Sequence, residues 1–276
     1  KEGPLGACFD LHDPDGLFGA ATWEGAESEM QRQAFNTLLA QAGCRDTDLG
    51  ALFAGDLLNQ CVGSAYGLQS FDIPYIGLYG ACSTAAEGLL LSSMLVSSGV
   101  LDLAAAVTSS HNAAAERQFR TPLEYGGQRP PTGQWTVTGA GAFVITTSEK
   151  AGGRELARVT HALPGIVVDM GVTDANNMGA AMAPAALDTL VRFFRATNRD
   201  PQSFDLIATG DLGYEGISIL NSLLRAEGFD LGERLNDCGM MIYSRDVQDT
   251  HAGGSGCGCS AVVLASYLLP KLCTGD

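Results

Sequence analysis

The chain has 276 residues, of which 46% are hydrophobic and 17% are charged, and its formal net charge is −15. This acidic excess excludes binding to nucleic acid or to anionic membrane surfaces, since both are bound through Lys and Arg. The apolar fraction excludes an intrinsically disordered chain. The composition therefore predicts an acidic globular protein with one large domain or two of ordinary size.

Neither a membrane span nor a signal peptide is predicted. The apolar run at residues 88–99 is too short to cross a bilayer, and the first eighteen residues are rich in Gly, Pro and Asp. The eight cysteines include no C-x-x-C pair, so a zinc site is not expected. Scattered single cysteines are typical of reduced thiols inside a cell.

Helix and strand patterns alternate through the first half of the chain. Residues 26–42 carry apolar side chains at helical spacing and stop before Gly43, which predicts an amphipathic helix. Helices separate most of the strands, which implies a mostly parallel sheet covered on both faces. The further elements predicted here are strands at 48–54, 74–78, 102–109 and 138–146, and helices at 57–68 and 84–98.

A second series of elements starts near residue 155. The predicted strands are 155–161 and 204–208, the predicted helices are 185–196, 217–226 and 261–269, and 240–243 fits either a strand or a helix end. An apolar strand ends in Gly-Asp in both series, at Asp56 and at Asp211, and a small-residue turn with a cysteine precedes a helix in both, at 80–83 and 257–260. Because the matches share their order, they predict an internal duplication with halves 1–150 and 151–276. The duplication also leads us to expect that the opening strand of the first half and the closing strand of the second half are missing.

Duplicated βαβ halves with a cysteine at a strand-turn-helix corner resemble the thiolase superfamily, which includes the ketoacyl-carrier-protein synthases. The chain resembles more closely the stage V sporulation protein AD family. The stretches that carry this resemblance are AGDLLNQ (54–60), YGACST (79–84), SSHNAAAERQFRTPLEYGGQRP (109–130), MGAAMAPAA (178–186) and AGGSGCGCSAVV (252–263). It implies an α/β thiolase-like fold, in which two duplicated βαβ halves form a layered αβαβα sandwich with mostly parallel sheets.

The resemblance also implies a function. Members of the family are implicated in binding dipicolinic acid, alone or as its calcium chelate, and in its uptake into the forespore of endospore-forming bacteria. The partners implied are membrane proteins of the same sporulation operon, and the location implied is intracellular in sporulating cells, peripheral on the forespore or spore inner membrane. No cofactor is expected apart from the calcium of the chelate. Thiolase-fold proteins are commonly dimers, so a homodimer stays an open alternative.

Cys82 stands at the predicted helix N-terminus, where the helix dipole is expected to lower the pKa of its thiol. The matching cysteine of condensing enzymes accepts the acyl group; the alternative is a small buried hydrophobe. Those enzymes also need neutral His or Asn donors, and the corresponding positions here hold Asp211 and Gly254. We therefore expect binding rather than catalysis. A Cys-dependent acyltransferase or 3-ketoacyl synthase using Cys82, and a structural subunit with a vestigial pocket, are the two alternatives.

Asp56 and Asp211 are expected near the carboxyl edge of the sheet, where ligands of α/β proteins bind. Asp56 is the candidate for contact with ligand-borne calcium, and capping of the following helix is an equal alternative for it. For Asp211, capping of the following helix is the favoured role. Arg117, together with Arg120, could bind the carboxylates of dipicolinate or pair with surface acids. The complete set of expected ligand-binding residues is Asp56, Cys82, Ser83, His111, Asn112, Arg117, Asp211 and Ser255.

Overall fold

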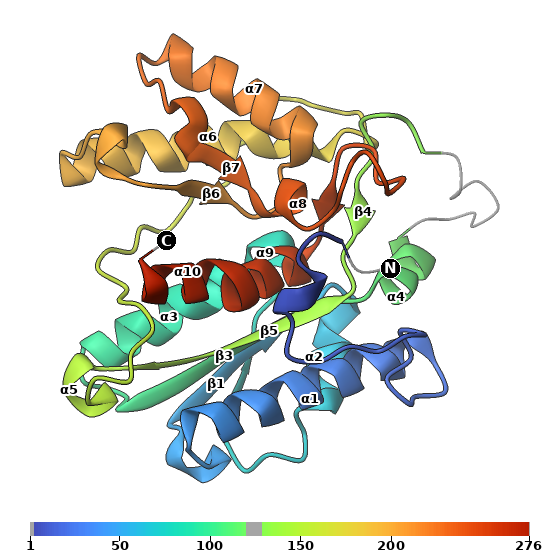
Figure 1. Cartoon of the computed structure of the whole chain (residues 1–276), viewed down its shortest axis with the longest axis vertical. Coiled ribbons are helices and arrows are strands. Elements are labelled where there is room, and N and C mark those ends of the chain that lie inside the picture. The colour runs from blue at the N-terminus through green and yellow to red at the C-terminus, as the bar shows by residue number, and fades with distance from the viewer. Residues whose placement is uncertain (1–2, 120–128, 276) are drawn as a thin grey trace.

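Figure 1 shows the computed structural model of the chain, which describes residues 3–119 and 129–275. The elements stack in five layers: helices, a four-stranded sheet, helices, a two-stranded sheet and helices again. This arrangement is the αβαβα sandwich expected from the sequence.

The four-stranded sheet forms the core of the first half. Its order is β2-β1-β3-β5; β2, β1 and β3 run parallel, and β5 runs antiparallel to β3. The central strand β1 is buried at every position because helices cover both faces of the sheet. The strands are β1 (Ala51–Gly55), β2 (Tyr75–Gly77), β3 (Leu103–Ser110) and β5 (Gly139–Thr146).

Helices α1 (Trp23–Ala42) and α2 (Val62–Gly67) lie on one face of this sheet, and α3 (Thr84–Ser97) and α9 (Cys257–Val263) lie on the other (Figure 1). Thr22 caps α1 by accepting a hydrogen bond from the Gly25 N–H. The helix ends at Gly43, whose left-handed φ of 65° is accessible to glycine at little cost. The helix that the sequence predicts at 26–42 is thus confirmed.

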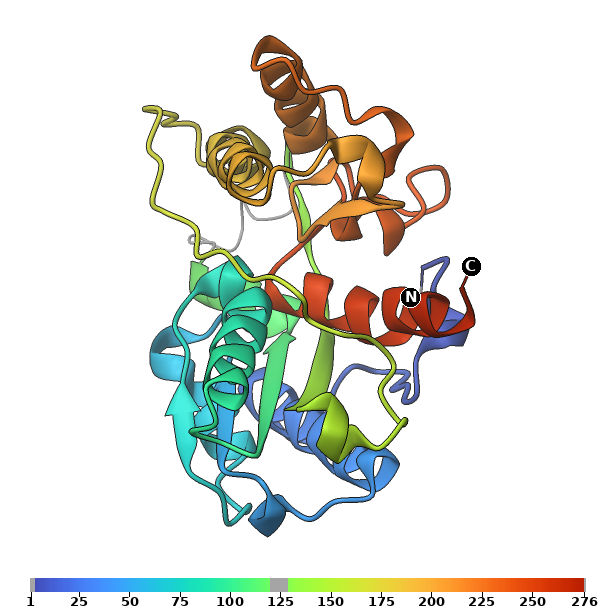
Figure 2. The same ribbon diagram turned by 90° about the vertical axis from the view of Figure 1, so that its left-hand side faces the viewer.

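The last helix of the chain belongs to the middle layer. From α9 it continues through a π-helical segment, Leu264–Leu268, into α10 (Leu269–Thr274). The run Cys257–Thr274 is long and apolar enough to cross a membrane by length and composition alone. Its first turns are nevertheless buried against β3 and β5, and Figure 2 shows it running between the two sheets. The residues from Leu264 to Thr274 include no buried one, so only the first part of this helix belongs to the core.

The second half is built on β6 (Ile207–Thr209), which pairs in parallel with β7 (Leu235–Asp237). Helices α6 (Met178–Thr197) and α7 (Gly213–Ala226) pack together over these strands around a cluster that includes Phe194, Leu220 and Leu224. The remaining elements are α4 (Asn112–Phe119), α5 (Ser148–Ala151), α8 (Cys238–Met241) and the short parallel pair β4 (Trp135–Thr136) and β8 (Gly254–Ser255).

Some predicted elements are wrong in position or type. Residues 155–161, predicted as a strand, have no regular structure and are mostly exposed, because no strand lies beside them to accept their backbone hydrogen bonds. Helix α6 begins at Met178 instead of residue 185 and contains Pro184. The sequence did not predict β4, β7 or β8, whose two or three residues are too few to show a period. The division of the chain at residue 150 stays a prediction.

Candidate functional site

Cys82 lies at a sharp corner between β2 and α3. The corner is a 3-10 turn, Ala81–Ser83, directly followed by the first residue of α3. Ala81 has a φ of 46°, a left-handed conformation that is costly for a residue with a Cβ. Ser83 is exposed, and its hydroxyl donates to the Gly80 carbonyl at 2.7 Å. The strained turn carries Cys82, which is half-buried as a residue.

The second half of the chain supplies the opposite side of this corner. Asp211 follows β6, is buried, and accepts a hydrogen bond from the Gly256 N–H at 2.9 Å. The Ser255 hydroxyl lies 3.5 Å from the same carboxylate oxygen. The Cys82 thiol also hydrogen-bonds to this carboxylate. The structure thus brings together Cys82, Asp211 and Ser255, and we call these three residues with Gly256 the Cys82 corner.

Burial determines the charge states at the Cys82 corner. Desolvation raises the pKa of Asp211 to about 6. Burial, followed by the nearby Asp211 charge, raises the pKa of the Cys82 thiol well above its ordinary value. The expectation of a lowered thiol pKa is therefore wrong, because burial and the neighbouring carboxylate outweigh the helix dipole. At neutral pH the corner holds a neutral thiol beside a carboxylate.

Gly256 is a site residue that sequence reasoning missed. It is the N-terminal cap residue of α9, with a φ of 97° that favours glycine. Its N–H points toward both the Asp211 carboxylate and the Cys82 sulfur. The run of glycines from 253 to 258 was the available signal, but a sequence does not show which of them turns its N–H into the site.

Asp211 does not cap the following helix, as the sequence favoured. The residue before α7 is Leu212, which has no side-chain cap. Asp237, at the end of the unpredicted strand β7, accepts instead from the N–H groups of Leu212 and Gly213 at 2.8 and 2.9 Å. Asp237 takes over the capping role and leaves Asp211 free to face Cys82.

Asp56 is buried within the first half rather than open to a ligand. Its carboxylate accepts from the Leu58 N–H at 2.8 Å, from the Ser64 N–H at 2.6 Å and from the Ser64 hydroxyl. Ser64 is in the first turn of α2, so Asp56 ties β1 to the start of that helix. Between the two open alternatives, the contacts fit the structural role.

His111 and Asn112 lie at the end of β3, as expected, but both turn away from Cys82. The His111 ring places Nε2 at 2.8 Å from the Gly16 carbonyl and stacks obliquely 5.4 Å from the Trp23 ring. Burial lowers the pKa of His111, so it is neutral near pH 7. The Asn112 amide donates to the Thr136 carbonyl at 3.2 Å.

Arg117 is on α4 and forms an ion pair with Glu24 at the start of α1. Its guanidinium thus pairs with a surface acid, one of the two alternatives drawn from the sequence. Arg120 lies outside the described residues. Arg117 is therefore not free to bind a carboxylate of the ligand while this ion pair is intact.

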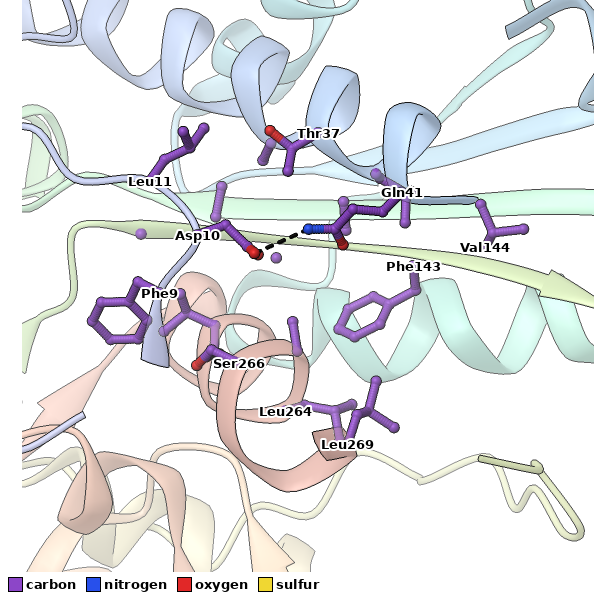
Figure 3. A pocket seen from close by; sticks show the side chains of 18 of the residues that line it. Phe9, Asp10, Leu11, Thr37, Gln41, Phe143, Val144, Leu264, Ser266 and Leu269 are labelled. Carbon is purple, nitrogen blue, oxygen red and sulfur yellow. Dashed lines mark hydrogen bonds between the residues drawn. The ribbon is translucent and has the colours of Figure 1, made fainter. Parts of the chain in front are cut away.

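A separate cavity of about 1840 Å³ lies along β5, between α1 and the C-terminal helix. His111 and Asn112 are part of its wall, whereas Cys82, Asp211 and Ser255 are not. Figure 3 shows that many of the side chains around it are apolar, among them Phe9, Phe143 and Leu264, with a hydrogen bond from Gln41 to Asp10 at one side. The lining also includes charged side chains, among them Lys150 and Arg154, but none of the three predicted residues that meet at the Cys82 corner. The Cys82 corner is the better candidate site.

A family model described as stage V sporulation protein AD (SpoVAD) matches residues 1–276. The chain belongs to this family. Stage V sporulation protein AD of Bacillus subtilis (strain 168) is 45% identical over 275 residues, which cover 100% of this chain and 80% of that protein. The family resemblance predicted from the sequence is confirmed.

Solved structures of the thiolase-like type share the fold of this SpoVAD family member. OleA of Xanthomonas campestris, crystallised with lauric acid and lauroyl-CoA, aligns with a TM-score of 0.62 and 14% identity over 86% of this chain and 73% of OleA. The priming β-ketosynthase of the R1128 polyketide pathway aligns with a TM-score of 0.54 and 16% identity over 92% of this chain and 74% of its own. These likenesses confirm the thiolase-like fold.

The priming β-ketosynthase is an enzyme by its name, and acyl transfer at a cysteine sets two requirements for a site. A nucleophilic cysteine must be available as the thiolate, and a tetrahedral oxyanion must find free N–H donors. Here the thiol is held neutral, and the Gly256 N–H already binds a carboxylate. A negative group at that donor would repel an oxyanion rather than stabilise it.

Proposed function

We propose that the chain binds dipicolinic acid as its calcium chelate at the Cys82 corner and does not transfer acyl groups. The single observation that carries the proposal is the Asp211 carboxylate, which faces Cys82 and occupies the Gly256 N–H. Membership of a sporulation family is consistent with a spore ligand. The uptake of dipicolinate into the forespore is the process in which such binding would act.

The charge of the site selects the form of the ligand. A free dianion would be repelled by Asp211, whereas calcium is a hard cation that takes carboxylate oxygens as ligands. Asp56 is tied to Leu58 and Ser64 within the first half, whereas Asp211 faces Cys82, so we propose Asp211 rather than Asp56 as the calcium contact. Ser83 is exposed next to Cys82 in the chain, and its hydroxyl would have to leave the Gly80 carbonyl to donate to a carboxylate of the ligand.

Isothermal titration calorimetry tests this proposal. Calcium dipicolinate should bind the wild-type protein, and dipicolinate with a calcium chelator should bind at least about tenfold more weakly, which corresponds to about 1.4 kcal/mol. Asp211→Asn should remove the preference for the calcium form. Asp205→Asn is the matched control, because Asp205 precedes the same strand and is exposed.

Three results would overturn the proposal. These are no heat of binding at ligand concentrations of about 1 mM, equal affinity of Asp211→Asn and wild type for the chelate, and tighter binding of the free dianion. A Cys82→Ala variant that binds as well as wild type would remove the thiol from the site but leave Asp211 in it.

The first alternative is an acyltransferase or ketoacyl synthase that uses Cys82, and the enzymes of the same fold favour it. Mass spectrometry after incubation with acyl-CoA decides between the two functions. A stable acyl adduct on Cys82 would establish the enzyme. The absence of an adduct, with binding of the chelate, supports the proposal.

The second alternative is a structural subunit with a vestigial pocket. In our proposal the protein reaches the forespore membrane through membrane proteins of its operon, because its net charge of −15 disfavours anionic lipid. Co-purification with those proteins, combined with no affinity for calcium dipicolinate, would establish the structural subunit instead.

A further inference from the structure

A second buried polar cluster lies in the first half, between α1, β1, α2 and β3. Its members are Glu27 and Gln31 of α1, Asp56 after β1, Ser64 of α2 and Ser109 of β3, and each is at most 2% exposed. We call it the Glu27 cluster. It joins α1 to the sheet, and the proposed ligand site makes no use of Glu27 or Gln31.

The hydrogen bonds of this cluster leave two acceptors without a donor. Gln31 Nε2 donates to the Gly55 carbonyl and to the Ser109 hydroxyl, both at 3.0 Å, and Ser109 donates to Glu27 Oε1 at 2.9 Å. Glu27 Oε2 and Gln31 Oε1 are buried and have no hydrogen-bond partner among the described residues. A buried acceptor left in that state costs about 1–3 kcal/mol. Two such acceptors in one cluster indicate that one of its groups carries a further proton that can be donated.

The two unpaired oxygens belong to neighbouring side chains. Residues four apart on a helix lie on the same face, so Glu27 and Gln31 are adjacent along α1. An ionised Glu27 can only accept hydrogen bonds, whereas a protonated one also carries an O–H donor. A single proton on Glu27 Oε2 would supply the missing donor for Gln31 Oε1 and satisfy both atoms together.

The charges around Glu27 favour that proton. Asp56 faces it from β1, and Glu24 lies one turn earlier on α1, with its charge paired to Arg117 of α4. The Cys257 thiol of α9 also lies near Glu27, and Ser64 and Ser109 are uncharged. Burial first, and then the Asp56 charge, raise the pKa of Glu27 to about 8.

Asp56 is the member of the pair that keeps its charge. It accepts three hydrogen bonds, which stabilise a carboxylate, whereas Glu27 accepts only one. Gly63 separates the two: a Cβ at this residue would lie 3.1 Å from Asp56 Cγ and 3.1 Å from Glu27 Cγ. Negative charges on both carboxyls would repel each other.

We propose that Glu27 is a neutral carboxylic acid in the folded protein, that its Oε2–H donates to Gln31 Oε1, and that this proton holds α1 on the sheet. The Glu27 cluster is then a proton-dependent latch. When the proton leaves, Gln31 Oε1 loses its donor and Glu27 repels Asp56, so the contact between α1 and the sheet weakens in alkaline solution.

Infrared spectroscopy tests the proton directly. The wild-type protein at pH 7 should show the carbonyl stretching band of a protonated carboxylic acid, and the band should fade as the pH passes about 8. Glu27→Gln should lose the part of the band that titrates near pH 8, because its amide is neutral and can donate to Gln31 Oε1 in the same way. Absence of the band from the wild type at pH 7, or persistence of that part in Glu27→Gln, would overturn the proposal.

The second measurement compares urea unfolding of wild type and Glu27→Gln across pH. The pKa of Glu27 is about 8 when folded and about 4.5 when unfolded, so only the folded state keeps the proton between these values. The unfolding constant of wild type relative to Glu27→Gln should therefore rise about tenfold per pH unit from about pH 4.5 to about 8 and then level off.

Glu29→Gln is the matched control on the same helix. Arg32 holds the pKa of Glu29 below its ordinary value, so the unfolding constant of wild type relative to Glu29→Gln should be flat over this range. A flat ratio for Glu27→Gln would contradict the latch. If Glu27→Gln fails to fold, the pH titration of the wild-type infrared band alone decides.

Discussion

The state of one residue, Cys82, depends on a balance between two opposing effects. The dipole at the N-terminus of a helix stabilises a negative charge by about 0.3–1 kcal/mol, which is less than one pKa unit. Burial of a titratable group shifts its pKa by up to about 3–5 units. The Asp211 carboxylate adds repulsion in the same direction as burial. The thiol is therefore neutral, although its place at the start of α3 is the one that the sequence predicts.

Alkylation with iodoacetamide at pH 7 tests this balance, because the thiolate is the form that reacts. Cys82 should react more than about tenfold more slowly than the exposed Cys8 in the same sample. Asp211→Asn removes the repulsive charge and should speed the reaction of Cys82 by about tenfold, as for a shift of one pKa unit. Peptide mass spectrometry with time gives both rates, and a Cys82 that reacts faster than Cys8 would contradict the assignment.

Contacts distant in sequence decided which predicted site residues come together. Cys82, Asp211 and Ser255 were all predicted, but the direction in which Asp211 points follows from Asp237, which no motif marked. His111 was expected in the ligand pocket because it follows β3. Its ring instead bonds to Gly16, 95 residues away, and a local sequence pattern carries no information on such a partner.

Among the elements, long periodic segments were predicted well and short ones were not. Helices α1 and α3 and strands β3 and β5 lie within a few residues of their predicted positions. Strand β7 has only three residues, Leu-Asn-Asp, and becomes a strand because it pairs with β6. Residues 155–161 have the pattern of a strand without a neighbour to pair with. Strand formation in these cases depends on tertiary pairing rather than on local sequence.

The close approach of β5 and α9 is a second property of elements, and glycine makes it possible. A Cβ at Gly141 would lie 2.4 Å from the Ala261 carbonyl oxygen, and the backbone of α9 has little room to move. Gly141→Ala should therefore destabilise the protein by about 1–3 kcal/mol. Gly165→Ala is the control, since that Cβ would lie 3.4 Å from its nearest neighbour, the Thr189 hydroxyl. Urea unfolding measures both, and equal stability of the two variants would contradict the close packing.

At the scale of the whole molecule, two groups of carboxyls respond to pH in opposite directions. Burial raises the pKa of Glu27 to about 8 and of Asp211 to about 6, and it also raises those of Asp56 and Asp237. Surface acids such as Glu29 and Asp48 have lowered pKa values because of nearby arginines. The surface acids contribute stability that is lost only in acid, whereas the buried acids contribute stability that is lost as the pH rises.

The protein should therefore be most stable in mildly acidic solution rather than at pH 7. Between about pH 4.5 and 6 the folded state keeps protons on both Glu27 and Asp211, whereas the unfolded chain releases them. For each of these protons, the free energy of unfolding falls by about 1.4 kcal/mol for every unit by which the pH rises. Above about pH 6 Asp211 is ionised in both states, so the slope should halve and then vanish near pH 8. Urea titrations at half-unit pH steps give this profile, and the double variant Glu27→Gln, Asp211→Asn should flatten it. A free energy of unfolding of the wild type that rises from pH 5 to 8 would show that the buried carboxyls are ionised in the folded protein. Stability increases with pH only where the folded state binds fewer protons than the unfolded state.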